Sequence, residues 1–348
     1  MKTLVMLAPN IPLFDTNAGD YRIYRMLKIL SEKYRVFFSC YRSHVPEIRY
    51  LDALKKNGVR VLEWTDLKKF FVREKVDTVI FEFCGTVIRF LRCFNRLPGC
   101  RRIIDSHRIG FLEKFPERPD LKSSRLSREE ELGVYKRADI LLAVTDRERD
   151  IISRETGVRS ETLITGINLP RKVRERKGRK GIVFTGSMNN FQNQDAVIYF
   201  TERIYPLIKE RVPGVEFTIV GNNPSEKVRG LEGGSLRVTG YVPDTEVYAS
   251  SALISVAPLR ICSGLQHKII EAAAYGTPVV ATPAAAAGPG LINGREVLVS
   301  GDAEGFASHI ISLYNESEIW QKISSGGYGK IKENYTLEIM RERLLEIV

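Results

Sequence analysis

The chain has 348 residues, of which 43% are hydrophobic and 27% are charged, and its net charge is +11. This length favours two domains, and this composition excludes a disordered or fibrous protein. No apolar run reaches the roughly 18 residues of a membrane span, and the N-terminal run MKTLVMLAPNIPLF predicts a first strand instead of a secretion signal. The five cysteines have no CxxC spacing, so we expect no structural zinc, no disulfide framework and a cytoplasmic location.

The positive charge lies mostly in the first half of the chain. Residues 1–170 contain 32 Lys and Arg against 23 Asp and Glu, which leaves 21 against 19 for the rest. Two explanations remain open. The first half meets an anionic partner, such as the inner face of the cell membrane as a peripheral protein, or the charge serves only solubility. No DNA- or RNA-binding motif accompanies the charge, so we expect no nucleic-acid partner.

Short apolar runs alternate with helical segments along the first half, which predicts βαβ units around a parallel sheet. The strand candidates are residues 3–9, 35–41, 59–64, 77–83, 101–106 and 139–145. Between the first two of them, the segment DYRIYRMLKILSEKY predicts an amphipathic helix. Its apolar face would contain Tyr21, Tyr24, Leu27, Ile29 and Leu30.

A strongly basic segment, RKVRERKGRKG at 171–181, interrupts this alternation and predicts an exposed linker between two domains. The alternation then restarts, with strand candidates at 182–186, 216–221, 236–241, 253–259 and 278–283. The chain from Glu304 to Val348 has a helical pattern throughout. We therefore expect a first domain at 1–170, a second at 182–335, and a C-terminal helix at 336–348 that packs back on the first domain.

Glycines follow several of the predicted strands, at the edge where parallel sheets bind ligands. Gly186, Gly221 and Gly240 follow three strands of the second half, and Gly19 follows the first strand of the chain. A glycine there lets backbone N–H groups approach a phosphate at a helix N-terminus. Strand-to-helix turns need glycine for their own geometry as well, so a single glycine does not decide for a ligand.

The stretch RICSGLQHKIIEAAAYGTPVV combines charge with such a turn. Ser263 and Gly264 are expected to open a helix that ends at a glycine cap, Gly276. Arg260 at the strand end and Lys268 one turn into the helix would then place two cations and free backbone donors around one anionic group.

Glu271 follows Lys268 by three residues and so shares its helix face, where it would accept hydrogen bonds from ribose hydroxyls. The alternative is an ordinary surface pair of lysine and glutamate, which contributes little to stability. The small residues of AAAYGTPVVATP argue against it, because they let this helix pack closely on the next strand.

The same stretch resembles the donor-site motif of GT-B glycosyltransferases, in particular the large retaining group called family 4. Other segments fall in the order that this family shows: AGDYRIYRML, ADILLAVTDRERDII, IVFTGSMNNFQNQDAVIYF, EFTIVGNNP, LRVTGYVPD and NGREVLVSGDAEGFA. The resemblance implies an α/β protein with the GT-B fold, in which two Rossmann-like doubly wound domains face each other across a cleft. The first domain would bind the acceptor and the second the nucleotide sugar.

The resemblance also implies roles for single residues. Arg260 and Lys268 would hold the diphosphate, Glu271 the ribose, and Gly19 would lie under the transferred phosphate and sugar. His107, in IIDSHRIG after a strand, takes the place of a histidine near the donor sugar, with a purely structural histidine as its alternative. The predicted catalytic residues are His107, Arg260 and Lys268, and the predicted donor-binding residues are Gly19, Gly186, Ser187, Gly221, Tyr241, Val242, Arg260, Ser263, Gly264, Leu265, Lys268 and Glu271, with the base near Tyr241 and Val242.

The sequence departs from the family pattern in two places near this site. Ser263 stands where the first of two family glutamates would be, so the contact with the sugar hydroxyls must differ. The segment SMNNFQNQ lacks the arginine and lysine that many members have after the strand at 182–186. More of the phosphate binding therefore falls to Arg260 and Lys268.

The expected function is transfer of a sugar, with retention of configuration, from a UDP- or GDP-linked donor to a glycan, lipid-linked sugar or polysaccharide precursor. No Asp-x-Asp pair occurs in the sequence, so we expect catalysis by basic side chains without a metal or another cofactor. Two other functions remain open. One is a GT-B nucleotide-sugar epimerase, whose motifs we do not find, and the other is a catalytically silent nucleotide-binding scaffold.

Overall fold

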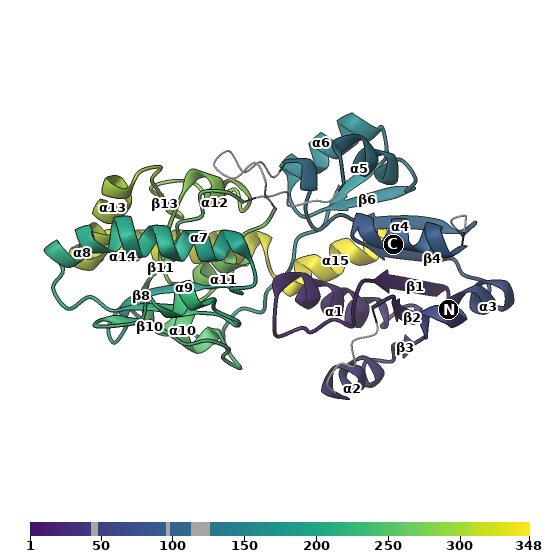
Figure 1. The fold of residues 1–348 in the computed structure, drawn as a ribbon, viewed down its shortest axis with the longest axis horizontal. Helices are drawn as coiled ribbons and strands as arrows, with labels where there is room; N and C mark the ends of the chain where they lie inside the picture. Colours follow the sequence, from purple (N-terminus) through teal and green to yellow (C-terminus); the bar gives the residue numbers. More distant parts are fainter. Residues whose placement is uncertain (43–47, 95–97, 113–125, 263) are drawn as a thin grey trace. The chain divides into compact units, whose positions relative to one another are not determined.

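The computed structural model describes residues 1–42, 48–94, 98–112, 126–262 and 264–348. The chain divides into two compact units (Figure 1). The first unit comprises Met1–Thr165 and Glu338–Val348, and the second comprises Gly166–Leu337. The second unit is therefore inserted in the sequence of the first.

The first unit is built on a seven-stranded sheet in the order β3-β2-β1-β4-β5-β6-β7, and all of its strand pairs are parallel. Because the order reverses beside β1, right-handed crossovers place helices on both faces of the sheet. Its strands are β1 (Thr3–Ala8), β2 (Arg35–Cys40), β3 (Arg60–Val61), β4 (Thr78–Glu82), β5 (Arg101–Asp105), β6 (Ile140–Ala143) and β7 (Ser160–Thr162). Its helices are α1 (Ala18–Leu30), α2 (Ile48–Lys56), α3 (Leu67–Arg73), α4 (Cys84–Phe94), α5 (Arg128–Tyr135), α6 (Asp146–Thr156) and α15 (Leu337–Ile347), with single 3-10 turns at Trp64–Asp66 and Gly110–Leu112.

The second unit repeats this plan with a six-stranded parallel sheet in the order β10-β9-β8-β11-β12-β13. Its strands are β8 (Lys180–Thr185), β9 (Phe217–Val220), β10 (Leu236–Val238), β11 (Ala252–Ala257), β12 (Val279–Ala281) and β13 (Leu298–Val299). Its helices are α7 (Phe191–Tyr199), α8 (Tyr205–Arg211), α9 (Glu226–Arg229), α10 (Glu246–Ser251), α11 (His267–Ala274), α12 (Pro283–Ala287), α13 (Ala303–Asn315) and α14 (Ser317–Asn334), with a π-helical turn at Phe200–Ile204. The predicted α/β architecture of two doubly wound sheets is confirmed.

Apolar runs explain why the central strands lie where they do. Every residue of β1 and of β11 is buried, as expected for a parallel strand covered on both faces. In α1 the buried face differs from the predicted one, since Tyr21 and Tyr24 are only half-buried. The buried residues are Arg22, Ile23, Met26, Leu27, Ile29 and Leu30. Arg22 can be buried on this face because it forms an ion pair with the buried Asp105.

The basic segment 171–181 is only partly an irregular connection. β8 begins at Lys180, two residues before the predicted start of the second domain. Arg179 is 5% exposed, and its guanidinium donates to the carbonyl groups of Arg174 and Tyr275 and to the hydroxyl of Thr277. The boundary between the two units falls earlier, between Thr165 and Gly166.

Helix α15, drawn in yellow in Figure 1, belongs to the first unit. Its residues Met340, Leu344 and Ile347 are buried. Arg341 forms an ion pair with Glu32 (2.7 Å), and Arg343 forms one with Glu161. The C-terminal helix is thus fixed by both apolar burial and charge.

Two segments at the border of the second unit run side by side. Ile167 forms an isolated parallel bridge with Thr336, through hydrogen bonds from Ile167 to the carbonyl of Tyr335 (2.8 Å) and from Leu337 to the carbonyl of Ile167 (3.0 Å). The outgoing and the returning chain are therefore joined where they enter and leave this unit.

No helix among the described ranges is long and apolar enough to cross a bilayer.

Candidate functional site

Each sheet has one point at which the strand order reverses, and parallel sheets bind ligands beyond the carboxyl ends of the strands at such points. In the first unit the reversal lies between β1 and β4, and in the second between β8 and β11. The predicted residues follow β1 and β5 in the first unit, and β8, β9, β10 and β11 in the second. We describe the two groups separately.

Lys268 occupies the first turn of α11 and is half-buried. Its ammonium group donates to Oδ1 of Asn193 (2.6 Å) and lies 4.5 Å from the centre of the Phe184 ring. Burial lowers the pKa of Lys268 to about 8. A partly buried cation gains from an anionic ligand, because the Asn193 amide oxygen to which it donates is neutral.

Asn193 connects this lysine to the loop after β8. Its Nδ2 donates to the carbonyl of Ser187 (2.8 Å), and the side chain packs against Gly186, where an added Cβ would lie 2.8 Å from Nδ2. Gly221 after β9 is equally tight, since an added Cβ would lie 1.8 Å from the carbonyl oxygen of Gly186. The N–H groups of Gly186 and Gly221 donate to the carbonyls of Val220 and Gly240. These two glycines thus allow the two loops to pack, and their own amides are engaged.

Arg260 lies just beyond β11 and binds Asp195 through two hydrogen bonds, one of them 3.0 Å from Nε to Oδ2. Its guanidinium also lies 5.2 Å from the centre of the Tyr199 ring. The Arg260 side chain is 38% exposed, so the ion pair contributes at most about 1 kcal/mol. Arg260 can therefore exchange its carboxylate for a phosphate at little cost.

Glu271 lies one turn after Lys268 on α11 and accepts a hydrogen bond from the hydroxyl of Thr245 (2.8 Å). Burial raises the pKa of Glu271 to about 7, against this hydrogen bond, which lowers it. Tyr241 is 49% exposed, and Val242 packs against Val183, Val220 and Ala252. A carboxyl group that already accepts a hydrogen bond from a hydroxyl can exchange it for one from a ribose hydroxyl.

The start of α11 differs from the prediction. The helix begins at His267 and not at Ser263 or Gly264, so Lys268 lies in its first turn instead of one turn inside it. Gly264 has φ 70°, which is not helical, and an added Cβ on Gly288 would lie 2.1 Å from its carbonyl oxygen. Leu265 is half-buried, and Ser263 lies outside the described residues. The end of the helix is as predicted, with Gly276 at φ 66°.

In the first unit the fold brings Gly19 and His107 together. Gly19 is in the first turn of α1, and an added Cβ there would lie 3.6 Å from Nδ1 of His107. The imidazole stacks on the ring of Phe83, with centroids 3.9 Å apart and planes 20° apart. Both aromatic residues have positive φ, 66° for Phe83 and 54° for His107, a strained conformation that is kept mainly at functional sites.

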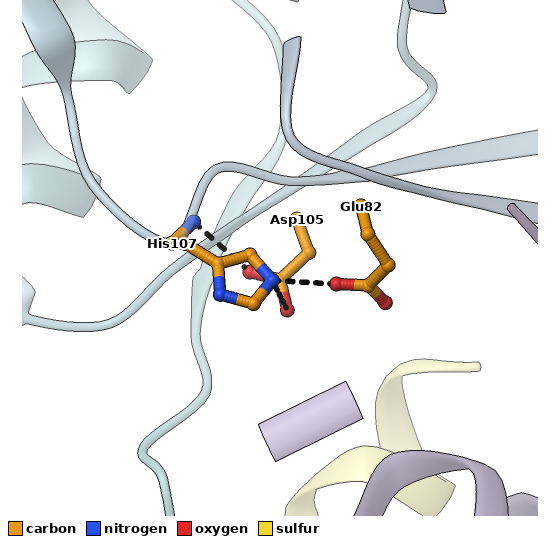
Figure 2. Close-up of side chains that lie close together, drawn as sticks. All are labelled: Glu82, Asp105 and His107. Carbon is orange, nitrogen blue, oxygen red and sulfur yellow. Dashed lines mark hydrogen bonds and ion pairs between the residues drawn. The ribbon is translucent and has the colours of Figure 1, made fainter. Parts of the chain in front are cut away.

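Two carboxylates at the ends of neighbouring strands surround this histidine (Figure 2). Nε2 of His107 lies 2.6 Å from Oε2 of Glu82, the last residue of β4, and 3.8 Å from Oδ2 of Asp105, the last residue of β5. Burial raises the pKa of Glu82, and the nearby Asp105 raises it further. Burial alone would raise the pKa of Asp105 as well, but Arg22 and His107 lower it below its usual value.

Arg22 fixes Asp105 from the opposite side. Its Nε and Nη2 donate to the two carboxylate oxygens (2.7 and 3.2 Å), and its Nη1 donates to the carbonyl of Leu163 (2.8 Å). Both side chains of the pair are fully buried. Removing one partner of such a pair costs about 3–5 kcal/mol, because the other charge then stays buried without compensation.

Glu82, Asp105 and His107 each offer a ligand atom within 4.8 Å of the others, which is metal-like spacing. The donor set does not suit a divalent cation, since Arg22 uses both oxygens of Asp105 and adds a positive charge beside them. We interpret the cluster as an ion-paired network that holds His107.

The sequence analysis did not identify Asn193, Asp195 and Thr245 in the second unit or Arg22, Glu82 and Asp105 in the first. A signal was available for two of them. Glu82 and Asp105 are the next-to-last residues of the predicted strands 77–83 and 101–106, close to the strand ends where ligand-facing residues were sought. Asn193 and Asp195 could not be found in this way, because their partners Lys268 and Arg260 are 75 and 65 positions away.

Two doubly wound parallel sheets, with these residues at their switch points, define a protein of the GT-B fold class. Residues 179–316 match the family model described as glycosyl transferases group 1. The matched residues all lie within the second unit.

Solved structures of glycosyltransferases share the fold over the whole chain. Sucrose-phosphate synthase from Thermosynechococcus elongatus has a TM-score of 0.77 at 14% identity, with 99% of this chain and 98% of that one covered. Anabaena HepE in complex with UDP and glucose has a TM-score of 0.76 at 11% identity, covering 100% and 99%. A variant of S. aureus TarM in complex with fondaparinux, α-GlcNAc-glycerol and UDP has a TM-score of 0.75 at 12% identity, covering 100% and 99%.

One curated relative, "Uncharacterized 44.6 kDa protein in cps region" from Klebsiella pneumoniae, is 23% identical over 163 residues. The match covers 44% of this chain and 42% of the relative, so it spans less than half of the relative's length.

Proposed function

We propose that this chain is a glycosyltransferase that moves a sugar from a nucleotide-sugar donor to a glycan or lipid-linked acceptor. The second unit binds the nucleotide part of the donor, and the first unit binds the acceptor. Transfer retains the anomeric configuration and needs no metal, because basic side chains stabilise the leaving diphosphate. The observation that carries the proposal is the half-buried Lys268, held by Asn193 beside the loop of Gly186 and Ser187.

Lys268 and Arg260 differ in what they offer a diphosphate. Lys268 exchanges a neutral amide oxygen for a charged phosphate oxygen, whereas Arg260 must first leave Asp195. Hydrogen bonds between charged partners are roughly twice as strong as those between neutral ones. We therefore assign most of the diphosphate affinity to Lys268, and to Arg260 the bidentate contact that orients the leaving group.

The ligands of similar structures support the choice of donor. HepE has been solved with UDP and with UDP-glucose, and the TarM variant with UDP and sugar-containing ligands. We propose a UDP-linked sugar as the first donor to test and a GDP-linked sugar as the second. The basic first half suits an acceptor with a diphosphate or a peripheral position on an anionic membrane, as would serve polysaccharide synthesis.

The test begins with thermal unfolding in the presence of UDP-, GDP-, ADP- and CMP-sugars, followed by calorimetry with the nucleotide that stabilises the protein most. We expect the Lys268→Ala and Glu271→Ala variants to lose nucleotide affinity, by about 10- to 100-fold for the lysine. The control is Lys209→Ala, which removes an exposed lysine that lies over the Tyr205 ring in the same unit.

Unchanged affinity in both site variants would show that the donor site has been misplaced. Nucleotide binding without transfer to any acceptor would favour the silent scaffold. Conversion of the nucleotide sugar in the absence of acceptor would favour an epimerase.

A further inference from the structure

His107 is held on two sides by residues of the strand β4 and its end. The ring of Phe83 stacks on one face, and Glu82 contacts the Nε2 edge at 2.6 Å (Figure 2). The Glu82 side chain is completely buried, and its second oxygen, Oε1, has no hydrogen-bond partner within the described part of the chain. Among those residues, the imidazole is therefore the hydrogen-bond partner of this carboxyl group.

The other ring nitrogen points away from the two carboxylates (Figure 2). Gly19 lies on the side of this nitrogen: an added Cβ on Gly19 would lie 3.3 Å from Oδ1 of Asn17, 3.6 Å from Nδ1 of His107 and 3.7 Å from the Phe83 ring. A side chain at position 19 would thus occupy the space in front of Nδ1.

The carboxylates decide which nitrogen carries the proton. Burial raises the pKa of Glu82, whereas His107 and Arg22 act against this effect and favour the ionised form. In that form the carboxylate only accepts hydrogen bonds, so its short contact with Nε2 requires a proton on that nitrogen. In a neutral imidazole, a proton on Nε2 leaves Nδ1 as an acceptor, since the hydrogen bond of one nitrogen sets the state of the other. Asp105, 3.8 Å from Nε2 and bound to Arg22, acts in the same direction.

We propose that Glu82 is a positioning residue for sugar transfer: it accepts a hydrogen bond from Nε2–H of His107 and leaves Nδ1, beside Gly19, to accept one from a hydroxyl of the transferred sugar. The inference rests on the proposed function and adds to it a residue and an atom. Glu82 acts through His107 and does not touch the substrate.

The first experiment is nitrogen-detected NMR of protein with labelled histidine, with the His107 signals assigned from a His107→Gln variant. We expect Nε2 to be protonated and Nδ1 to be bare in the wild-type protein. The Glu82→Ala variant should lose this preference. The Glu82→Gln variant should keep it, because the amide oxygen can accept the same hydrogen bond.

The second experiment measures transfer kinetics and nucleotide binding with the same variants. We expect Glu82→Ala to lower kcat on the order of 100-fold and Glu82→Gln to lower it less than about tenfold, since a neutral acceptor replaces a charged one. Nucleotide affinity by calorimetry should not change, because Glu82 does not contact the nucleotide. A matched control is Glu296→Gln, which alters a buried glutamate of the second unit that accepts from the Ile292 amide.

The outcomes separate this inference from the proposed function. A wild-type ring with its proton on Nδ1, or wild-type kcat in Glu82→Ala, would overturn the role of Glu82. Loss of activity in Glu82→Gln equal to that in Glu82→Ala, with native thermal unfolding, would also contradict it. Wild-type protein that transfers no sugar at all contradicts the proposed function instead, and the NMR measurement needs no substrate.

Discussion

The ammonium group of Lys268 is poorly compensated, because burial removes solvent from it and its partner Asn193 is neutral. Its pKa of about 8 lies well below that of an exposed lysine. Below this pKa the side chain is charged and attracts a diphosphate, and above it the attraction is lost. Glu271 acts in the same direction, because its ionisation near pH 7 adds a negative charge on the same helix face.

We predict that affinity for a nucleoside diphosphate falls as the pH rises from about 7 to 9. A bound diphosphate favours the charged lysine, so its folded-state pKa rises on binding, and binding near pH 8.5 takes up a proton. Calorimetry in two buffers with different ionisation enthalpies measures this uptake.

The Lys268→Arg variant is the control for this pH dependence, since arginine stays charged throughout the range. Its affinity should be flat above pH 8, apart from the effect of Glu271. Wild-type affinity that is constant from pH 7 to 9, without proton uptake, would mean that Lys268 does not meet the phosphates.

At the scale of residues, the sequence singled out Lys268, Glu271 and Arg260 because they stand in one short motif that resembles a family donor site, and their roles stay a prediction. It did not identify their hydrogen-bond partners. Thr245 contacts Glu271 from another helix, and no local pattern links the two. The same holds for Arg22, whose position in an apolar stripe is explained only by Asp105, 83 residues away.

At the level of elements, α11 ends in a crowded turn. Gly276 has φ 66°, and an added Cβ would lie 2.3 Å from Cγ1 of Val173. We predict that Gly276→Ala lowers the free energy of unfolding by about 2–4 kcal/mol, the sum of left-handed backbone strain and overpacking. Urea denaturation followed by circular dichroism measures this loss.

Gly214→Ala is the matched variant for this comparison, because Gly214 also has positive φ (74°) in the same unit but has no atom within 4 Å of an added Cβ. It should cost only the backbone strain, about 1–2 kcal/mol. Equal losses in the two variants would mean that the contact with Val173 yields without cost.

The sequence predicted best the strands that are buried on both faces, because such strands are continuous apolar runs. The central strands are continuous apolar runs, and the structure confirms all eleven predicted strands, although β3 is only Arg60–Val61. β7 and β13 were missed. β7 reads Ser-Glu-Thr and is half-buried at the edge of its sheet, and β13 has only two residues, so neither presents an apolar run.

At the level of the whole molecule, the first unit depends on a helix that is distant in sequence. α15 contributes the buried residues Met340, Leu344 and Ile347, and Arg101 donates to the carbonyl of Val348 (2.8 Å). We predict that truncation after Leu337 destabilises the first unit by about 5 kcal/mol, at roughly 1.5–3 kcal/mol for each buried side chain. Hydrogen exchange should then increase throughout 1–165.

The second unit provides the internal reference for the truncation. Its peptides should keep their protection, and a nucleotide should still stabilise it. Arg341→Ala removes the ion pair with Glu32 at the surface and should leave the stability nearly unchanged, because exposed ion pairs contribute little. Unchanged hydrogen exchange in 1–165 after truncation would show that α15 does not contribute to the stability of the first unit.

The insertion of one unit within the other has a consequence for synthesis. The ribosome completes Met1–Thr165 first, but the helix that finishes this unit emerges only after all of Gly166–Leu337 has been made. We therefore expect the nascent first unit to leave the apolar surface that Met340, Leu344 and Ile347 cover exposed while the second unit is made. Once Glu338–Val348 has been made, the bridge between Ile167 and Thr336 brings the late helix back to the start of the interruption, so we expect the unit that is translated first to complete its folding after the second.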